Sequence, residues 1–428
     1  MMSFREFIKE TRSVQEVRNY VENLKENMNS TNIKSISIDA STPRGLSSNS
    51  IENKKFSNTH TFYTPSYISF FITAIAIERF IKEFSSDCVT SDRDGDVITQ
   101  GYEYDYGVVG TILTKGKVTF VYEGDLFEYS LHLNALNIKI NFNNGEKLLK
   151  ELENVISGGS NFLKNKHVYL YQTDDGIAWK IKKPPTIRWE NLIMDKKLKE
   201  AIYDATIMHM RLLGTSSGSI SYGIQGGGKS FVCQSLICEA LSEGFSTCHL
   251  TSAVNFEELD ELLTKYLTPC LVVLEDIDSF AQDREAYENA GLSNFLQFLS
   301  GVTEKSENIN IMATTNFIDK LDKAVNDRPM RFNQKFLIDY LEDEERNQIL
   351  DLYFKEQKLT ETQKALCCKK IYKAFTASHI SAIYERFSFL KKKDEFLKLE
   401  SINLFEKALE DVSSHFKTMK SKKGVGFN

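Results

Sequence analysis

The chain has 428 residues, of which 41% are hydrophobic and 26% are charged, and its formal net charge is −6. This length predicts about two or three domains with proper cores, and the mild acidity gives no electrostatic reason to expect a nucleic-acid partner. The seven cysteines are scattered without a C-x-x-C pair, which argues against a disulfide framework and a zinc site and favours a reducing cytoplasm.

The first part of the chain predicts a helix and then a tether. Its start has mixed charge and lacks the apolar region of a signal peptide. Residues 1–28 are expected to form a helix with a broken apolar stripe, which either packs on its own protein or docks on a partner. Residues 29–59 are rich in asparagine, serine and threonine and predict a flexible linker.

Residues 60–182 predict a small α+β domain. A helix is expected over 65–84, and its apolar run is too short for a membrane span of about 20 residues. Apolar residues then alternate over 102–142, with a break at Lys115-Gly116, which predicts an antiparallel meander. Two more elements complete the expected domain, a helix over 145–156 and a hairpin over 167–181. Because no catalytic constellation occurs in it, its expected task is recognition or assembly.

Gly223–Ser230 fits the phosphate-binding pattern G-x-x-x-x-G-K-[ST]. Glycines let backbone N–H groups curl around a polyphosphate, and the predicted following helix points its positive end at the anion. Lys229 is expected to reach the outer phosphates, and the Ser230 hydroxyl is expected to bind Mg²⁺. The residues of this stretch expected to bind ATP are Gly223, Gln225, Gly226, Gly227, Gly228, Lys229, Ser230 and Phe231.

An apolar strand over 270–274 ends in two carboxylates, Glu275 and Asp276. The strand must be apolar because its neighbours bury it, and the acids must lie at its C-terminal edge, where open α/β sheets bind ligands. One carboxylate would hold the Mg²⁺ shell and the other would polarise the attacking water. The pattern therefore predicts an ATP-hydrolysing site rather than a solvated loop.

Two further patterns follow along the chain. A second buried strand is expected over 309–314, and the segment ends in the neutral amide donor Asn316. Beyond it, Arg328 and Arg331 stand three positions apart in the segment Arg-Pro-Met-Arg-Phe. Strand and helix patterns alternate around these motifs, which predicts a mainly parallel sheet with covering helices.

The order of these four motifs resembles that of the AAA ATPase family, within the AAA+ superfamily. Leu-Glu-Asp-Ile-Asp at 274–278 is similar to the BCS1-like branch. The resemblance covers about residues 185–385 and implies an α/β fold. A P-loop AAA module is expected over 185–340, after the α+β N-terminal domain, and a small helical lid over 341–413. Residues 414–428 are expected to form a frayed basic tail.

The resemblance implies a role for each acidic and amide side chain. Glu275 stands where the family usually has its metal-side Asp, so Glu275 and Ser230 would bind Mg²⁺. Asp276 stands where the family usually has its catalytic Glu, and Asn316 matches the residue that places the attacking water. The acid pair is swapped relative to most relatives, but the BCS1-like branch shares the swap, so it does not predict a dead site.

The remaining roles that the resemblance implies concern the neighbouring subunit and the base. Arg328 and Arg331 match the arginine fingers, which act on the neighbouring subunit's nucleotide and imply a homo-oligomer, such as a hexamer-like ring. Asn191, Leu192 and Ala377 match the segments on either side of the adenine. For Asn191 and Ala377, ordinary packing accounts for the residue at that position as well as contact with the adenine does.

Residues 251–256 lack the aromatic-apolar-glycine pore loop of protein-threading relatives. Phe256 would either take the aromatic role or pack against a helix, so threading is not predicted. The favoured function is that of a Mg²⁺-dependent ATPase ring that remodels or moves a protein client bound by residues 1–182. Two alternatives stay open: a nucleic-acid-linked protein of the helicase or clamp-loader type, and a nucleotide-gated assembly protein with little hydrolysis.

Overall fold

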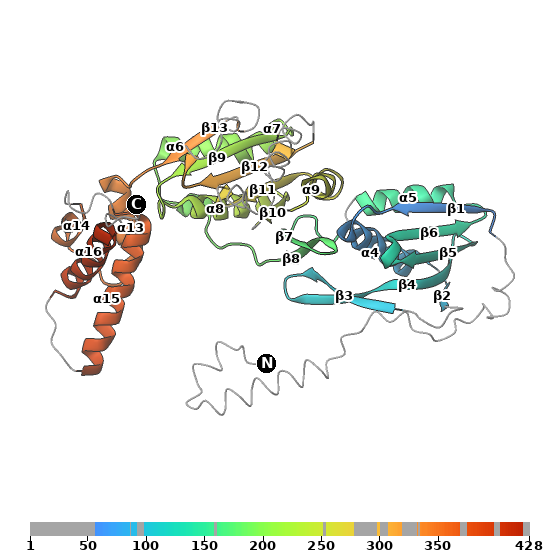
Figure 1. Cartoon of the computed structure of the whole chain (residues 1–428), viewed down its shortest axis with the longest axis horizontal. Helices are drawn as coiled ribbons and strands as arrows, with labels where there is room; N and C mark the ends of the chain where they lie inside the picture. The colour runs from blue at the N-terminus through green and yellow to red at the C-terminus, as the bar shows by residue number, and fades with distance from the viewer. Residues whose placement is uncertain are drawn as a thin grey trace. The chain divides into compact units, whose positions relative to one another are not determined.

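The computed structural model describes residues 56–85, 87–91, 98–157, 161–250, 254–277, 298–299, 307–318, 332, 334–368, 375–397 and 403–422. The helix predicted over 1–28 and the linker as far as residue 55 lie outside these residues. The chain forms two compact units. The first contains the residues up to 160 except residues 65–69, and the second contains residues 65–69 and the residues from 161 onward. Each unit has its own sheet (Figure 1).

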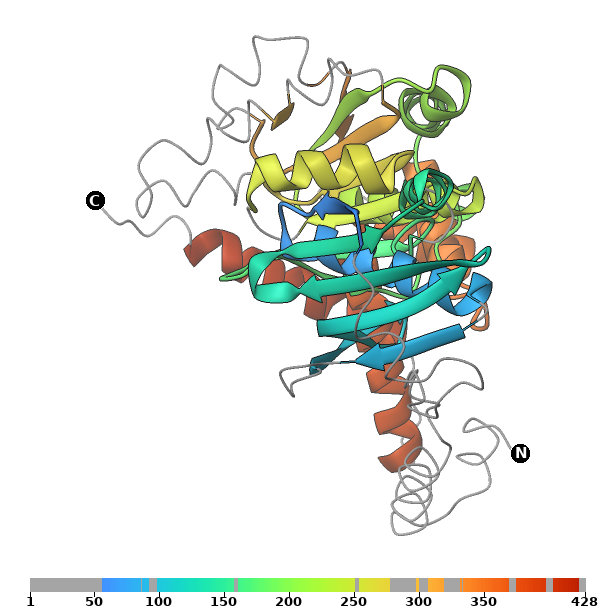
Figure 2. The same ribbon diagram turned by 90° about the vertical axis from the view of Figure 1, so that its right-hand side faces the viewer.

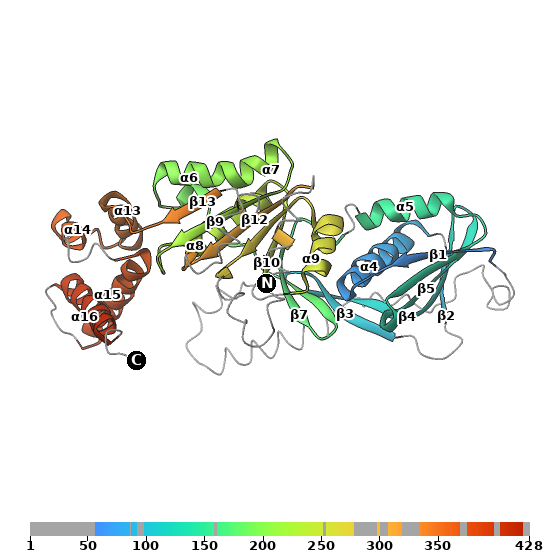
Figure 3. The same cartoon turned by 45° about the horizontal axis from the view of Figure 1, so that its top comes forward.

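The first unit is an antiparallel sheet with two helices against one of its faces (Figures 1 and 3). Its elements are β1 (Asn58–Tyr63), α4 (Tyr67–Phe84), β2 (Asp87–Ser91), β3 (Ile98–Asp105), β4 (Val108–Tyr122), β5 (Asp125–His132), β6 (Asn137–Phe142) and α5 (Glu146–Ser157). The strand order is β1-β6-β5-β4-β2, and β3 also pairs with β4. The predicted antiparallel meander is therefore confirmed.

The two faces of this sheet differ in burial. Val118, Tyr129 and Ile140 are fully buried on the face that carries Tyr122. The ring of Phe80 in α4 lies 5.4 Å from that of Tyr122, and the Tyr122 hydroxyl donates to a carboxylate in α5, so both helices cover this face. Side chains at the alternate positions project from the opposite face, which no described helix covers. Figure 2 shows the strands of this sheet side by side.

The break predicted at Lys115-Gly116 does not end a strand. β4 continues through Gly116, whose φ of +141° is open to glycine but rarely adopted by other residues. Residues 108–115 of β4 pair with β3, whereas residues 117–121 pair with β2. The glycine therefore marks the point where one strand changes its partner.

The second unit begins with a seven-stranded sheet in the order β13-β9-β12-β11-β10-β7-β8. All its neighbouring strands are parallel except β7 and β8, which confirms the mainly parallel α/β module. The strands are β7 (His167–Thr173), β8 (Gly176–Ile181), β9 (Ser217–Gly223), β10 (Ser246–Leu250), β11 (Cys270–Leu274), β12 (Ile309–Thr315) and β13 (Gln334–Ile338). The helical segments around them are η2 (Trp189–Asn191), α6 (Lys196–Tyr203), η3 (Asp204–Met208), α7 (His209–Leu212), α8 (Lys229–Ser242), α9 (Phe256–Leu262) and η4 (Leu263–Leu267).

The β7–β8 hairpin corrects the predicted end of the N-terminal domain. The prediction joined it to residues 60–182, but β7 pairs in parallel with β10, with Val168 opposite Cys248. Val168 and Leu170 are fully buried in the second unit. Alternating apolar residues around a turn specify a hairpin but not the sheet that it joins, because that pairing is made between distant parts of the chain.

Four helices follow the second sheet and form the predicted helical subdomain: α13 (Asp343–Tyr353), α14 (Glu361–Cys367), α15 (Ala377–Leu397) and α16 (Leu404–Lys422). Phe354, Ile383 and Phe405 are among the residues of its core. α16 continues through the first part of the predicted basic tail, since the apolar residues at 409, 412, 416 and 419 keep helical spacing. Among the described helices, none combines the length and apolar content required to span a bilayer.

Candidate nucleotide site

Two glycines shape the loop between β9 and α8 for different reasons. Gly223 has a φ of +139°, and a Cβ on it would overlap the carbonyl oxygen of Ile338 on the neighbouring strand β13. Gly228 has a φ of +108°, but a Cβ on it would meet nothing within 4 Å. Gly223 therefore permits the close approach of β13, whereas Gly228 supplies only the backbone turn that starts α8.

We expect Gly223→Ala to lower the free energy of unfolding of the second unit by roughly 2–4 kcal/mol, because it combines a strained φ with a backbone overlap. Gly228→Ala is the matched control, since it strains φ alone and should cost about 1–2 kcal/mol. Urea denaturation followed by circular dichroism measures both. Equal losses in the two variants would contradict the role of the Ile338 approach.

Lys229 lies at the first position of α8 with its ammonium folded back over the loop. Its side chain is buried, and Nζ donates to the carbonyl oxygens of Gly223 at 3.1 Å and Ile224 at 2.8 Å. These carbonyls satisfy the buried cation. The ammonium is thereby held beside the backbone N–H groups that open α8, which is where a helix binds an anion.

Glu275 and Ser230 meet across the gap between β11 and α8. The Ser230 hydroxyl forms a side-chain hydrogen bond with the Glu275 carboxylate. Burial raises the pKa of Glu275 above its usual range, and the negative charge of Asp276 raises it further, whereas the Ser230 bond opposes the shift. Two oxygen ligands of the kind that Mg²⁺ prefers are therefore adjacent, as the sequence predicts.

Asp276 and Asn316 meet at the C-terminal ends of the parallel neighbours β11 and β12. Asn316 Nδ2 donates to Asp276 Oδ1 at 3.1 Å. The backbone N–H of Asp276 donates to Thr314 Oγ1 at 3.0 Å, and Asp276 has the left-handed φ of +51° that few non-glycine residues adopt. Thr314 was not predicted to support the site, although its place two residues before Asn316 on a buried strand was the available signal.

A cavity of about 340 Å³ lies beside the loop. The predicted ATP-binding residues in its lining are Asn191, Leu192, Gly227, Gly228, Phe231 and Ala377. Gly223, Gln225 and Gly226 do not line it, and Gln225 is exposed. The cavity has the size of a small-molecule site, and most of its lining side chains are apolar, which suits a planar base.

The helical subdomain supplies part of this lining. Ala377 was predicted to lie beside the base, whereas the contribution of α13 was not predicted. Ile349, Leu352 and Tyr353 of α13 line the cavity, together with Leu341 before it. The sequence predicted that residues 341–413 are helical but not what these helices meet. The cavity is therefore built jointly by the seven-stranded sheet with its connections and the helices that follow it.

A second contact joins the helical subdomain to the loop at Gly226. Ser378 Oγ in the first turn of α15 donates to the Gly226 carbonyl oxygen at 3.4 Å. A Cβ on Gly226 would lie 2.9 Å from the hydroxyl oxygens of both Thr376 and Ser378. A side chain at position 226 would therefore push the helical subdomain away from the loop.

The predicted arginine fingers, Arg328 and Arg331, lie outside the described residues. The structure thus brings together two pairs, Ser230 with Glu275 and Asp276 with Asn316, beside Lys229. The combination of a buried cation, hard oxygen ligands and the backbone N–H groups of a helix start suits a metal-bound polyphosphate.

Comparisons with known proteins give a family match and relatives for the part of the chain that contains this site. Residues 219–340 match the family model described as ATPase family associated with various cellular activities (AAA). AAA-ATPase At5g40000 of Arabidopsis thaliana is 29% identical over 206 residues, covering 40% of this chain and 44% of that protein. The probable mitochondrial chaperone bcs1 of Schizosaccharomyces pombe is 35% identical over 127 residues, covering 28% of this chain and 27% of that protein. The chain thus spans less than half the length of these relatives.

Among solved structures, the crystal structure of the FIGL-1 AAA domain in complex with ADP aligns with 56% of this chain and 92% of its own, at a TM-score of 0.42 and 18% identity.

Proposed function

From the premise that this chain belongs to the AAA ATPase family, we propose that it hydrolyses ATP with Mg²⁺ as an oligomeric, hexamer-like ring and thereby remodels or moves a protein client. The client would bind through the part of residues 1–182 that precedes the ATPase sheet. An AAA ATPase domain itself implies ATP hydrolysis. The ring, the metal ligands and the client are the proposal.

One observation carries the catalytic part of the proposal. The hydrogen bond from Asn316 to Asp276 places an amide donor and a carboxylate acceptor 3.1 Å apart at the C-terminal edge of the sheet. A water molecule in line with a terminal phosphate needs such a pair, because the carboxylate takes its proton and the amide fixes its position. Asp276 is therefore proposed as the base and Asn316 as its positioning residue.

The remaining side chains would hold the nucleotide. Ser230 and Glu275 would each give an oxygen to Mg²⁺, and Lys229 would exchange its two carbonyl partners for phosphate oxygens. Mg²⁺ when bound neutralises charge on the phosphates. The cavity lined by Asn191 and Ala377 would enclose the base, and the bond from Ser378 to Gly226 would couple the helical subdomain to phosphate occupancy.

A mixing experiment tests the ring. Arg328→Ala protein should bind ATP but hydrolyse it more than about tenfold more slowly, because it lacks the guanidinium that stabilises charge on the neighbour's phosphate. Mixing it with Lys229→Ala protein should restore turnover. The Lys229→Ala subunit keeps its arginine, and the Arg328→Ala subunit keeps an intact phosphate-binding loop on which that arginine can act. Phosphate release measures both.

The control for mixing is a Lys229→Ala/Arg328→Ala double variant, which has no arginine to lend and should restore nothing. Native mass spectrometry would establish that the variants assemble together. If mixed assemblies form and turnover does not recover, the arginine does not act between subunits.

A nucleotide-gated assembly protein with little hydrolysis is the second candidate, favoured by the swapped acid pair. The carboxylate of Asp276 is one methylene shorter than the usual Glu, and a displacement of about 1 Å can cost about 10²-fold in rate. Wild-type turnover no faster than that of Asp276→Asn protein, with ATP-dependent assembly intact, would decide for this candidate.

A further inference from the structure

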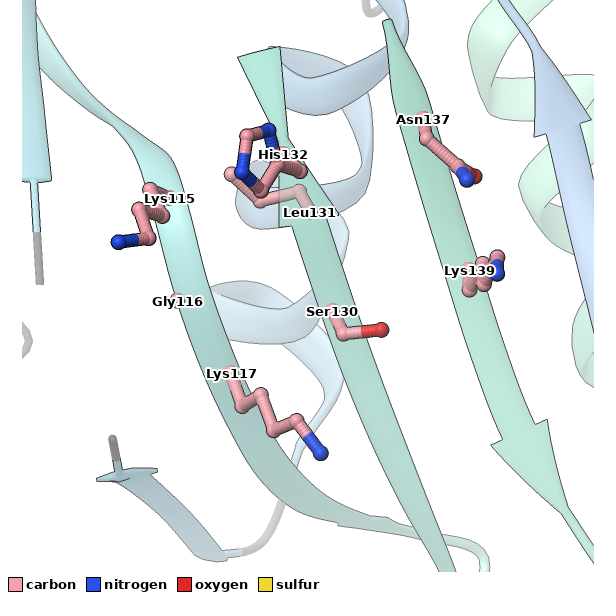
Figure 4. Close-up of a pocket in the computed structure, with 8 residues that line it drawn as sticks. All are labelled: Lys115, Gly116, Lys117, Ser130, Leu131, His132, Asn137 and Lys139. Atoms are coloured by element: carbon pink, nitrogen blue, oxygen red, sulfur yellow. The ribbon is translucent and has the colours of Figure 1, made fainter. Parts of the chain in front are cut away.

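The uncovered face of the antiparallel sheet holds a hollow of about 250 Å³. Figure 4 shows its lining residues on the neighbouring strands β4, β5 and β6. Strand register arranges the side chains of this face in two rows: Lys115, His132 and Asn137 form one, and Lys117, Ser130 and Lys139 form the other. The rows are two residues apart along each strand, which is about 7 Å.

Three lysines meet in this hollow in a chain whose net charge is −6. Lys117 is paired with Glu128 at 3.3 Å, on the same face. Lys115 and Lys139 form no ion pair with any residue in the described part of the chain. The ion pair of Lys117 with Glu128 leaves the charges of Lys115 and Lys139 uncompensated, one in each row. The hollow therefore keeps a net positive charge.

The other side chains of the two rows are hydrogen-bonding groups. Ser130 and His132 each stand between two neighbours of their row, next to the unpaired lysines. The Asn137 amide oxygen is buried without a hydrogen-bond partner among the described residues. Since an amide can turn end for end, Asn137 can present either its N–H₂ or its oxygen to a ligand. Groups that combine fixed positive charge with neutral donors suit an oxyanion.

We propose that this face binds carboxylates of an acidic, extended segment of the protein client, a step that rests on the proposed function. Lys115 and Lys139 are offset by one row, about 7 Å along the strands, and by two strands, about 10 Å across the sheet, which places them about 12 Å apart. Acidic side chains at alternate positions of an extended peptide recur on one face about every 7 Å, so two of them four residues apart, about 13 Å, would meet the two lysines.

The size and composition of the patch favour a peptide over other polyanions. Nucleic-acid surfaces combine an extended basic stripe with arginine or large aromatic groups that stack on bases, and the lining residues of this hollow include no arginine, phenylalanine, tyrosine or tryptophan. Adsorption to an anionic membrane surface uses clusters of about 4–8 basic residues, more than the two unpaired lysines present here.

The test uses the full-length protein and fluorescence anisotropy of a labelled peptide of alternating glutamate and serine. The peptide should bind, its glutamine–serine counterpart should not, and added salt should weaken the binding. Lys115→Gln/Lys139→Gln protein should bind about tenfold more weakly. Lys150→Gln, which changes an exposed lysine on α5, is the matched control and should bind like wild type.

Three results would overturn the proposal: unchanged peptide affinity in the double variant, tighter binding of oligothymidylate than of the peptide, and binding of inorganic phosphate as tight as that of the peptide. The second would indicate a nucleic-acid surface and the third a small-anion site. ATP turnover measured on the same preparations should be equal in wild type and the double variant. Absence of turnover in wild type would count against the proposed function alone, because peptide binding is read separately.

Discussion

Lys229→Ala protein will lose ATP turnover by at least about 10³-fold, and its affinity for Mg²⁺–ATP will fall with it. The Lys229 ammonium is buried, and it donates to the carbonyl oxygens of Gly223 and Ile224. When the nucleotide binds, charged phosphate oxygens would take the place of the neutral carbonyl oxygens as partners of the ammonium. The hydrogen bonds of Lys229 would therefore become stronger on binding. Alanine removes that gain.

Phosphate release and binding of a fluorescent ATP analogue measure the two losses separately. Lys197→Ala is the matched control, because Lys197 is an exposed lysine of α6 outside the cavity lining, and it should retain wild-type turnover. Robust turnover in Lys229→Ala protein would remove the loop from the catalytic site.

Asp276→Asn protein will bind ATP with near wild-type affinity but hydrolyse it about 10²–10⁴-fold more slowly. The substitution removes the base while keeping the local structure. Asparagine tolerates the left-handed φ of +51°, and its side-chain oxygen can still accept the hydrogen bond from Asn316. The bond from the backbone N–H of residue 276 to Thr314 is unaffected. A slow, ATP-filled protein is also suited to capture of a client.

Glu275→Gln is the comparison that distinguishes the two acids. Glu275 is hydrogen-bonded to Ser230, so its loss should raise the Mg²⁺ concentration required for half-maximal turnover, whereas Asp276→Asn should lower the maximal rate alone. A titration of Mg²⁺ at saturating ATP separates the two effects. The reverse pattern would assign the base to Glu275 and the metal to Asp276.

Local sequence determined the chemistry of the loop. The glycines, Lys229 and Ser230 are contiguous, and a phosphate-binding turn needs only contiguous residues, so their spacing carried the information. The apolar strands before Glu275 and before Asn316 likewise predicted buried parallel neighbours. Parallel neighbours end at one edge, and for that reason Asp276 and Asn316 meet.

Only the tertiary structure decided which elements meet across long stretches of chain. It placed the β7–β8 hairpin beside β10, it brought α13 to the cavity, and it set Ile338 against Gly223. Periodicity tells which face of an element is buried, but not which partner buries it, because that choice depends on the packing of the whole unit. The same limit applies to the rows of Lys115 and Lys139, whose charges share one hollow only through the register of three strands.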